Sequence, residues 1–283
     1  MTNAINAAKT IAFQGEPGAY ANLAAQQAVP HATAVPQPTF EDAIAAARNG
    51  DTDLVIIPVE NSLIGRIADI HHLLPDSGLH IVGEHFLPIR HQLLGLQDAT
   101  LADVTDVYSQ LPALAQCRKV LKGLTAHHWY DTAGSAKHVA ELKDKSAAAI
   151  ASTLAGEIYG LKVLQADVED EHHNATRFLI MSKQGERAAN QGKVVTTLVF
   201  QVKNAPASLY KALGAFATNN VNITKLESYQ LGGSFNATQF YADIQGHPDA
   251  PNVGAALQEL EFQTAKMTVM GVYPASPFRE DMP

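Results

Sequence analysis

The chain has 283 residues, of which 46% are hydrophobic and 17% charged, a composition typical of a well-buried globular protein of two or three domains. Its formal net charge of −8 argues against a nucleic-acid or anionic-membrane partner, because both need a basic surface. A single cysteine and the lack of an apolar run of signal-peptide or transmembrane length favour a cytoplasmic protein without disulfides.

Short apolar runs alternate with amphipathic segments through the N-terminal two-thirds of the chain, a pattern typical of α/β folds. Thr39 and Gly50 stand where a helix N-cap and a C-terminal stop belong. The predicted strands are 10–15, 53–62, 104–110, 126–131, 161–170 and 176–183, with two more extended pieces within 80–96. The predicted helices are 21–29, 40–50, 65–74, 112–124, 133–144 and the alanine-rich 146–160.

The polar segment 185–193 is predicted to be a linker. Beyond it, residues 194–275 follow the order βαββαβ of a ferredoxin-like unit, with the central strands joined by Leu231-Gly232-Gly233. The tail 276–283 is predicted to be disordered. We therefore expect an α/β fold with two lobes in residues 9–184, the second lobe spanning about 90–168, followed by a small βαββαβ domain.

The stretch PVENS is the first candidate for a binding site, because open α/β sheets place ligands at the carboxyl ends of their strands. Glu60, Asn61 and Ser62 stand between a buried strand and a predicted helix, whose N-terminal N–H groups suit a carboxylate. Helix capping by Asn61 and Ser62 is the alternative. Glu60 is expected to be either ionised and stabilised by the helix dipole, or partly desolvated with a raised pKa.

Two further strand-to-helix junctions carry small or polar residues. In DTAGS, Asp131 is a natural N-cap, and Thr132, Ala133 and Gly134 leave backbone amides open to an anion, although capping explains this stretch as well. The loop FQGEPGAY permits a tight turn, but it lacks GxGxxG and GK[ST], so a nucleotide site is only weakly indicated.

The stretch EHHNATRFLIM sets a cation at the start of an apolar strand. Strand alternation puts Thr176 and Phe178 on one face and Arg177 on the other, with both faces close to a cleft at the twisted strand start. The planar fork of Arg177 matches a carboxylate. The alternative is an ion pair with Asp170 or Glu171 on a solvated edge.

No metal site and no activated nucleophile are predicted. Adjacent histidines occur at 71–72, 127–128 and 172–173, but consecutive side chains point apart, and neither HExxH nor CxxC is present. GxSxG is also absent, and Cys117 lies in an apolar pattern that favours a packed thiol.

Four stretches, taken in this order, resemble the bacterial prephenate dehydratase family: PVENSLIGRIADI, DTAGSAKHVAE, AAIAS and YGLKVLQADVEDEHHNATRF. The C-terminal unit, with PASLYKAL and NITKLESYQ, resembles the regulatory ACT domain of that family. The resemblance implies two lobes like those of a type II periplasmic binding protein, with the site in the cleft between them. It also implies conversion of prephenate to phenylpyruvate, water and carbon dioxide without a cofactor.

The resemblance implies roles for particular residues. Arg177 and the helix N-termini are expected to hold the substrate carboxylates and Thr176 to hydrogen-bond the departing hydroxyl. If one residue supplies the proton, Glu60 is expected to do so, with its pKa raised by the anionic substrate. Asp131 departs from the family pattern, since it replaces the first hydroxyl of a Ser-Thr-Ala motif. The implied catalytic residues are Thr176, Glu60, Asn61 and Ser62, and the implied substrate-binding residues are Arg177, Phe178, Tyr20, Thr132, Ala133 and Gly134.

For the C-terminal unit the resemblance implies feedback control by L-phenylalanine in a homodimer or homotetramer. The motif ESYQ departs from the family's ESRP. Arogenate dehydratase, and a non-catalytic ligand sensor with an ACT domain, are the alternative functions. The implied phenylalanine-binding residues are Asn204, Ala207, Ser208, Leu209, Asn222, Leu226, Glu227 and Ser228.

Overall fold

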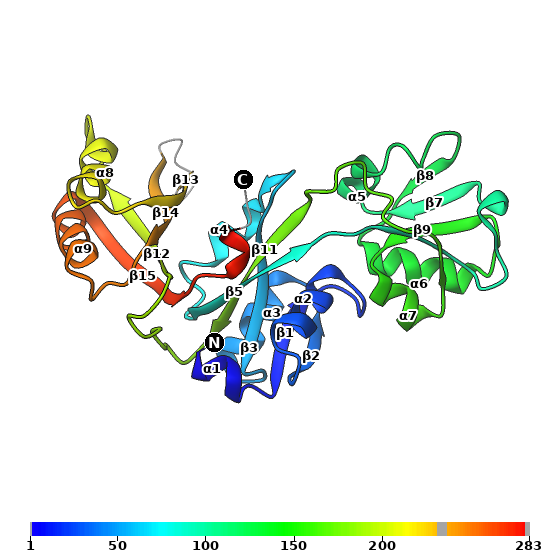
Figure 1. The fold of residues 1–283 in the computed structure, drawn as a ribbon, viewed down its shortest axis with the longest axis horizontal. Coiled ribbons are helices and arrows are strands. Elements are labelled where there is room, and N and C mark those ends of the chain that lie inside the picture. The colour runs from blue at the N-terminus through cyan, green and yellow to red at the C-terminus, as the bar shows by residue number, and fades with distance from the viewer. Residues whose placement is uncertain (1, 231–236, 281–283) are drawn as a thin grey trace.

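The computed structural model describes residues 2–230 and 237–280, and the predicted turn at Leu231-Gly232-Gly233 lies outside them. The described chain forms two α/β lobes and a C-terminal βαββαβ unit, which confirms the predicted fold class. The first lobe lies in the middle, between the second lobe and the C-terminal unit (Figure 1).

The first lobe is built on the strand order β5-β11-β3-β1-β2, with the short β4 paired to the end of β3. Helix α3 begins and ends as predicted, because the Thr39 side chain accepts from Asp42 N–H and Gly50 is left-handed. The elements are α1 Asn3–Ala7, β1 Thr10–Gln14, α2 Tyr20–Ala28, β2 Thr33–Gln37, α3 Phe40–Asn49, β3 Leu54–Asn61, β4 Gly65–Arg66, α4 Ala68–Leu73, β5 His80–Pro88 and β11 Ala175–Ser182.

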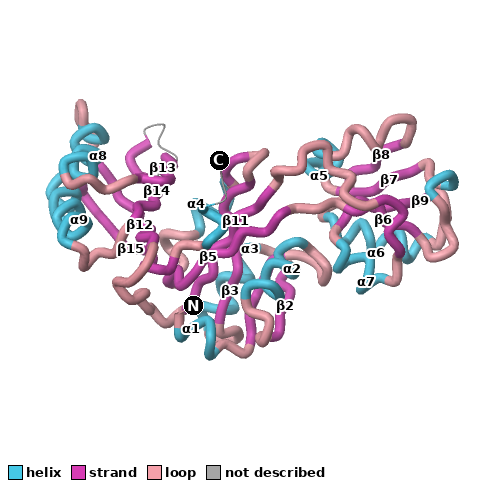
Figure 2. Tube along the Cα trace, in the orientation of Figure 1, coloured by secondary structure: helices cyan, strands magenta, loops and turns pink. Residues whose placement is uncertain are grey.

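The second lobe has the strand order β10-β6-β9-β7-β8 and is joined to the first lobe by the β5–β6 and β10–β11 connections (Figures 1 and 2). Its elements are β6 Gln92–Gly95, the 3-10 helix η1 Leu101–Asp103, β7 Asp106–Ser109, α5 Leu111–Gln116, β8 Thr125–His128, α6 Thr132–Leu142, β9 Ala147–Ala151, α7 Thr153–Tyr159 and β10 Lys162–Gln165.

Two helix predictions in the second lobe were wrong in extent. The alanine-rich segment 146–160 is a strand, β9, followed by helix α7, which Ser152 caps. Strand β9 lies between β6 and β7 and is buried at all its positions, so sheet pairing overrides the helix propensity of alanine. The predicted helix 112–124 ends early, since α5 stops at Gln116.

The C-terminal unit continues the sheet of the first lobe. Its strands follow the order β13-β14-β12-β15, and β15 pairs with β5 through Gly271 and Ile81. A Cβ at Gly271 would lie 2.2 Å from the Ile81 carbonyl oxygen, so this approach requires glycine. The elements are β12 Val194–Val202, α8 Ser208–Thr218, β13 Ile223–Gln230, β14 Ala237–Gln245, α9 Pro251–Gln263, β15 Thr264–Pro274 and the 3-10 helix η2 Pro277–Glu280.

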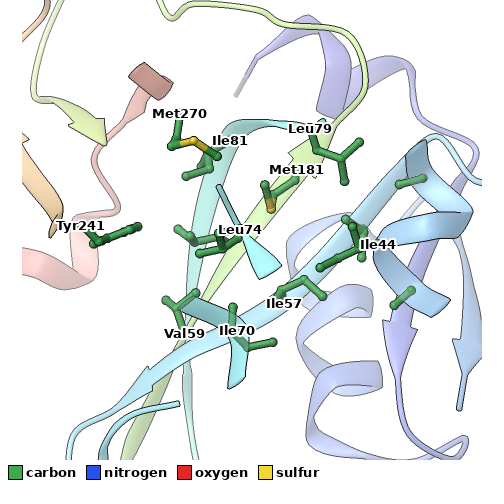
Figure 3. Packing of buried hydrophobic residues seen from close by; sticks show 14 of the residues in the cluster. Ile44, Ile57, Val59, Ile70, Leu74, Leu79, Ile81, Met181, Tyr241 and Met270 are labelled. Carbon is green, nitrogen blue, oxygen red and sulfur yellow. The ribbon is translucent and has the colours of Figure 1, made fainter. Parts of the chain in front are cut away.

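A shared hydrophobic core also joins the C-terminal unit to the first lobe. Helices α8 and α9 pack on one face of the C-terminal strands. On the other side, Tyr241 and Met270 belong to the same buried cluster as Leu74 and Ile81 of the first lobe (Figure 3). The C-terminal unit is therefore packed against the first lobe and is not merely tethered to it.

The tail prediction was wrong for residues 276–280. Phe278 stacks on Phe86 with ring centroids 5.0 Å apart, and Arg279 Nε donates to Glu84 at 2.6 Å. Since Glu84 is buried in β5, this ion pair and the ring contact fix η2 against the first lobe.

Candidate active site

A cavity of about 510 Å³ lies between the two lobes, and we call it the cleft. Residues of both lobes line it: Gln14, Gly15, Ala19, Tyr20, Ala21, Phe40, Pro58, Asn61, Ile64, Arg66, Ile67, Ile89 and His91, with Gln110, Pro112, Ala113, Gln116, Asp131, Thr132, Thr176 and Phe178. Gly18 helps to hold the lobes together, because its carbonyl accepts from Ser152 Oγ at 2.6 Å.

Strands β3 and β11 place alternate side chains in the cleft. They are antiparallel, with Thr176 opposite Asn61 and Arg177 opposite Glu60. Since successive side chains of a strand point to opposite faces, Asn61 and Thr176 reach the cleft while Glu60 and Arg177 point away from it. The motifs PVENS and TRF are therefore brought together as pairs, but only one pair lies in the cleft.

Asn61 orients the Thr176 hydroxyl. The Asn61 Oδ1 accepts the backbone N–H groups of Leu63 and Ile64, at 3.0 and 3.1 Å, so its Nδ2 must face the other way. Nδ2 donates to Thr176 Oγ1 at 2.9 Å and to Asn174 Oδ1 at 2.8 Å. Because Thr176 Oγ1 accepts this bond, its own hydrogen can be donated to a group in the cleft.

A chain of neutral polar groups continues from Asn174 across both lobes. Asn174 Nδ2 donates to Gln116 Oε1 at 2.8 Å, and His91 Nε2 lies 3.1 Å from the same oxygen. His91 Nδ1 is 2.8 Å from the Tyr20 hydroxyl. Burial lowers the pKa of His91, which favours the neutral imidazole, and the Tyr20 hydroxyl also donates to the Arg90 carbonyl at 3.0 Å.

Arg177 lies on the face of β11 that points away from the cleft. In this position it cannot anchor a substrate carboxylate in the cleft, although the sequence had predicted that it would. The side chain is 2% exposed. Its Nε donates to Glu84 at 2.8 Å, and its Nη1 to Glu60 at 2.9 Å and to Asp243 at 2.5 Å. The predicted ion pair with Asp170 or Glu171 is not formed: these three carboxylates bind Arg177, and Asp170 accepts from the backbone N–H groups of Arg118 and Lys119. Arg177 is the centre of an ion-pair network between the first lobe and the C-terminal unit.

The same network covers the remaining nitrogen of Arg177. Its Nη2 donates to the Tyr273 hydroxyl at 2.9 Å, and Thr197 Oγ1 lies 2.7 Å from that hydroxyl and donates to Asp243. Burial opposes the charge of Arg177, but Asp243 and the neighbouring groups raise its pKa well above the ordinary value. All its nitrogens are therefore used by the protein, and the charge is matched by carboxylates.

Glu60 is ionised and faces away from the cleft, so of its two predicted states the structure has the ionised one, stabilised by cations and not by a helix dipole. Burial pushes its pKa up, but the charges of Arg177 and Lys225 outweigh burial and hold the pKa below 4.5. Lys225 Nζ donates to Glu60 at 2.6 Å. The predicted helix N-terminus is also absent here, since β3 turns into β4 and α4 begins only at Ala68.

Ser62 lies beside the cleft and does not line it. Its hydroxyl donates to the His173 carbonyl at 2.9 Å and accepts from Ala175 N–H at 2.9 Å. These bonds join the end of β3 to the start of β11. Ser62 therefore has a structural position next to Asn61 and Thr176.

The N-terminus of α6 contributes Thr132 and Asp131 to the cleft, whereas Ala133 and Gly134 are buried in the first turn. Asp131 caps the helix as predicted and accepts from Gly134 N–H. Burial raises the pKa of the Asp131 carboxyl, against the lowering effect of the backbone N–H groups of Gly134 and Glu16. The carboxyl already occupies the end of this helix, so its N–H groups are not an open anion site.

Several cleft residues were missed from the sequence: Gln14, Arg66, Ile89, His91, Gln110 and Gln116. Asn174, which does not line the cleft but is hydrogen-bonded to Asn61 and Gln116, was missed as well. Asn174 and Arg66 adjoin motifs that the sequence marks, ATRF and NSLIG, and adjacency was the available signal. His91 and Gln116 carry no local signal, because only the packing of the two lobes brings them to Tyr20 and Asn174.

The predicted phenylalanine-binding residues fall into two groups. Asn204, Ala207, Ser208 and Leu209 line a pocket of about 250 Å³ together with Phe240. Asn222 precedes β13, and the rest of the second group lies on β13 at the edge of the sheet: Leu226, Glu227 and Ser228. The groups approach each other through Ser228, which pairs with Phe240 of β14.

Two observations bear on other classes of function. Burial raises the pKa of the Cys117 thiol to about 12, so this side chain is a packed thiol. Within residues 2–230 and 237–280, no helix combines the length and the apolar character needed to cross a membrane.

The fold and the cleft define a two-lobed α/β protein with a binding site between its lobes and a small C-terminal domain docked on the first lobe. Comparison with known proteins then identifies its family. The family model for prephenate dehydratase matches residues 11–186, and the chain belongs to this family.

Individual relatives cover almost the whole chain. The chain is 49% identical, over 97% of its length and 99% of the relative, to the "bifunctional N-acyl-homoserine lactone acylase/prephenate dehydratase" of Komagataeibacter europaeus. It is 36% identical, over 93% of its length and 72% of the relative, to the chloroplastic "arogenate dehydratase/prephenate dehydratase 2" of Arabidopsis thaliana. The solved prephenate dehydratase of Arthrobacter aurescens in complex with L-Phe is 28% identical, with a TM-score of 0.86 over 97% of this chain and 91% of that chain.

Proposed function

We propose that this chain is a prephenate dehydratase, which converts prephenate to phenylpyruvate, water and carbon dioxide. The observation that carries this proposal is the Thr176 hydroxyl, which Asn61 Nδ2 holds at 2.9 Å in the cleft with its hydrogen left for a ligand. The sequence position of this pair, in PVENS and ATRF, agrees with membership of the family.

The reaction needs no nucleophile from the protein. The bond between the ring and its carboxylate breaks, its electron pair enters the ring, and the ring hydroxyl leaves with a proton as water. Aromatisation drives the step, so the protein must orient the substrate and hydrogen-bond the leaving hydroxyl. Thr176 fits the second role. The apolar side chains of Phe178 and Ile89 would leave the ring carboxylate poorly solvated, which favours its loss.

Arogenate, which carries an ammonium group in place of the side-chain keto oxygen, is the alternative substrate. Asp131 favours this alternative, because an ionised carboxylate lining the cleft suits an ammonium and repels a dianion. The Arabidopsis relative is named for both activities. Comparing kcat/KM for prephenate and arogenate decides between them.

We also propose L-phenylalanine as an effector and a second copy of the chain as a partner. The support for the effector is the βαββαβ domain and the likeness to the Arthrobacter protein in complex with L-Phe. The support for a dimer or tetramer is strand β13, which lies at the edge of the described sheet and offers backbone groups for pairing. Mass measurement in solution, with and without L-phenylalanine, tests both.

The deciding assay incubates the purified protein with prephenate, and separately with arogenate, and follows phenylpyruvate or phenylalanine. We expect product from at least one of the two substrates. In the prephenate reaction, added L-phenylalanine should lower the rate of product formation. Binding of either compound without product would favour the ligand-sensor alternative. If neither compound binds nor reacts, the dehydratase proposal is wrong.

Amide hydrolysis is a second candidate function, because the Komagataeibacter relative is also named an N-acyl-homoserine lactone acylase. The apolar cleft residues Phe40, Ile64 and Ile67 offer a surface for an acyl chain. In such a reaction water adds across the amide, giving a fatty acid and homoserine lactone. This second function is tested by incubating the protein with an N-acyl-homoserine lactone and measuring the release of homoserine lactone. If no homoserine lactone is released, the acylase proposal is wrong.

A further inference from the structure

Arg66 is a cation of the cleft that also touches the C-terminal domain. It lies on β4, opposite Glu60, in the hairpin that follows Asn61. Among the described residues that line the cleft, Arg66 and Asp131 carry formal charges, and Arg66 is the positive one. Arg66 is therefore the cation that a dicarboxylate in this cleft would meet, because Arg177 and Lys225 do not line the cleft and are bound to Asp243 and Glu60.

The contact with the C-terminal domain is made by one nitrogen. Arg66 Nη1 donates to the Ser228 carbonyl at 2.9 Å and lies 3.8 Å from Glu227 Oε2. Both partners belong to the motif ESYQ on β13, which the resemblance marks for the effector. A guanidinium has five N–H donors, and this side chain is 44% exposed, so it can also offer donors to a ligand in the cleft.

We propose that Arg66 binds a carboxylate of the substrate and that strand β13 controls it through the Ser228 carbonyl. This inference rests on the proposed dehydratase function and assigns the regulation of the same cleft. A shift of β13 when the effector binds moves the Ser228 carbonyl and, with it, the guanidinium. Since coupling between two ligands is reciprocal, substrate bound to Arg66 must change the affinity for the effector by the same factor.

If Arg66 had a purely structural role, its substitution would have different effects. If the side chain only docks the two domains, its loss lowers stability and leaves the KM for substrate and the response to L-phenylalanine unchanged. The carbonyl partner belongs to the backbone, so substitution of Ser228 cannot remove it. Arg66 itself is therefore the residue to change.

The experiment compares Arg66→Gln and Arg66→Lys with the wild type, with Arg48→Gln as the matched control. Arg48 is an exposed arginine of the first lobe that does not line the cleft. Its substitution by glutamine removes the same charge without changing the cleft. For Arg66→Gln we expect the KM for prephenate to rise roughly 10- to 100-fold, as for loss of a charge-assisted hydrogen bond, with kcat changed much less. Arg66→Lys should recover part of the loss.

The second readout is regulation. In the wild type, L-phenylalanine should change the apparent substrate affinity, and in Arg66→Gln this change should disappear. An unchanged KM, or a full response to L-phenylalanine in folded Arg66→Gln, overturns the inference. Failure of the proposed function looks different, since the wild type itself would then form no product. In that case calorimetric titration with prephenate still tests whether Arg66 binds the carboxylate. Equal binding enthalpies and affinities for the wild type and Arg66→Gln would contradict this role of Arg66.

Discussion

Thr176 and Arg177 are consecutive residues of β11 whose side chains leave the sheet on opposite faces. Thr176 Oγ1 accepts from Asn61 in the cleft, while Arg177 Nη1 donates to Asp243 of the C-terminal domain at 2.5 Å. Strand β3 repeats the arrangement, with Asn61 in the cleft and Glu60 bound to Lys225 of the C-terminal domain. Any shift of the C-terminal domain that moves these ion pairs therefore acts on the strands that carry the cleft residues.

Replacing Thr176 tests the group proposed to act on the leaving hydroxyl. Thr176→Val keeps the shape and removes the hydroxyl, and we expect kcat to fall about 100-fold or more, the usual contribution of a positioned proton donor. Thr176→Ser keeps the hydroxyl and serves as the control, with a much smaller loss. The measurements are phenylpyruvate formation and a thermal melt. Near-normal turnover by folded Thr176→Val would contradict the assignment.

Replacing Glu60 separates a structural carboxylate from a proton donor. Because Glu60 is ionised and bound to Arg177 and Lys225, Glu60→Gln should keep turnover near neutral pH within about threefold. It should lower the free energy of unfolding by about 1–3 kcal/mol, since two charge-assisted bonds are weakened. A large fall in kcat with unchanged stability would restore the proton-donor role.

Replacing Arg177 should act mainly on stability. Arg177→Met removes the nearest cation of the buried Asp243 carboxylate and one of the two arginines bound to Glu84, which keeps Arg279, and we expect a loss of about 3–5 kcal/mol in urea unfolding. Arg118→Met, at an exposed arginine, is the control and should be nearly neutral. If Arg177→Met unfolds like the wild type but binds prephenate poorly, Arg177 contacts substrate after all.

The same network predicts loss of stability in acid. Burial raises the pKa of Asp243, but Arg177 and Thr197 outweigh it, so the folded pKa lies below 3.8, as that of Glu60 lies below 4.5. Groups whose pKa is lowered by folding contribute stability above their unfolded pKa, and this stability is lost as pH falls through the folded pKa. The free energy of unfolding should be level above about pH 5 and fall steeply below about pH 4.

Glu60→Gln offers a check on this pH dependence. The variant should reduce the slope of unfolding free energy against pH in the acid range, by up to about 1.4 kcal/mol per pH unit for one proton. Urea titrations between pH 7 and pH 3 measure it. A slope equal to that of the wild type would mean that Glu60 does not change its pKa on folding.

Asp131 predicts a pH dependence of substrate binding. Burial raises its pKa above the ordinary 3.8, and above this raised pKa the carboxylate repels a dianionic substrate. The kcat/KM for prephenate should therefore decrease as pH rises through the pKa of Asp131, and Asp131→Asn should abolish this decrease. Asparagine caps helices as well as aspartate does, so the fold should be kept.

The two candidate substrates respond to Asp131→Asn in opposite directions. The KM for prephenate should fall about 3- to 10-fold because a like charge is removed, whereas the KM for arogenate should rise because its ammonium loses a counter-ion. Steady-state kinetics with both compounds measures this. Equal effects on both substrates would place Asp131 away from the side chain in which they differ.

Local patterns predicted much of the architecture. The periodicity of the apolar residues indicated both lobes and the βαββαβ order, and Thr39, Asp131 and Gly50 marked helix ends where the structure has them. The alanine-rich strand β9 was not predictable in this way, because its state depends on the neighbouring strands β6 and β7. The tail was mispredicted because the partner of Arg279, Glu84, lies far away in the sequence.

For the candidate site, the sequence by itself determined which strands carry it and which residues alternate there: Asn61 with Glu60, and Thr176 with Arg177. A period of two places neighbours on opposite faces, but it does not say which face borders the cleft. Only the tertiary structure decided that, by docking the C-terminal domain on one face and the second lobe across the other. Arg177 therefore lies in the contact with the C-terminal domain, where it is bound to Asp243 and Glu84. The arginine that lines the cleft is Arg66.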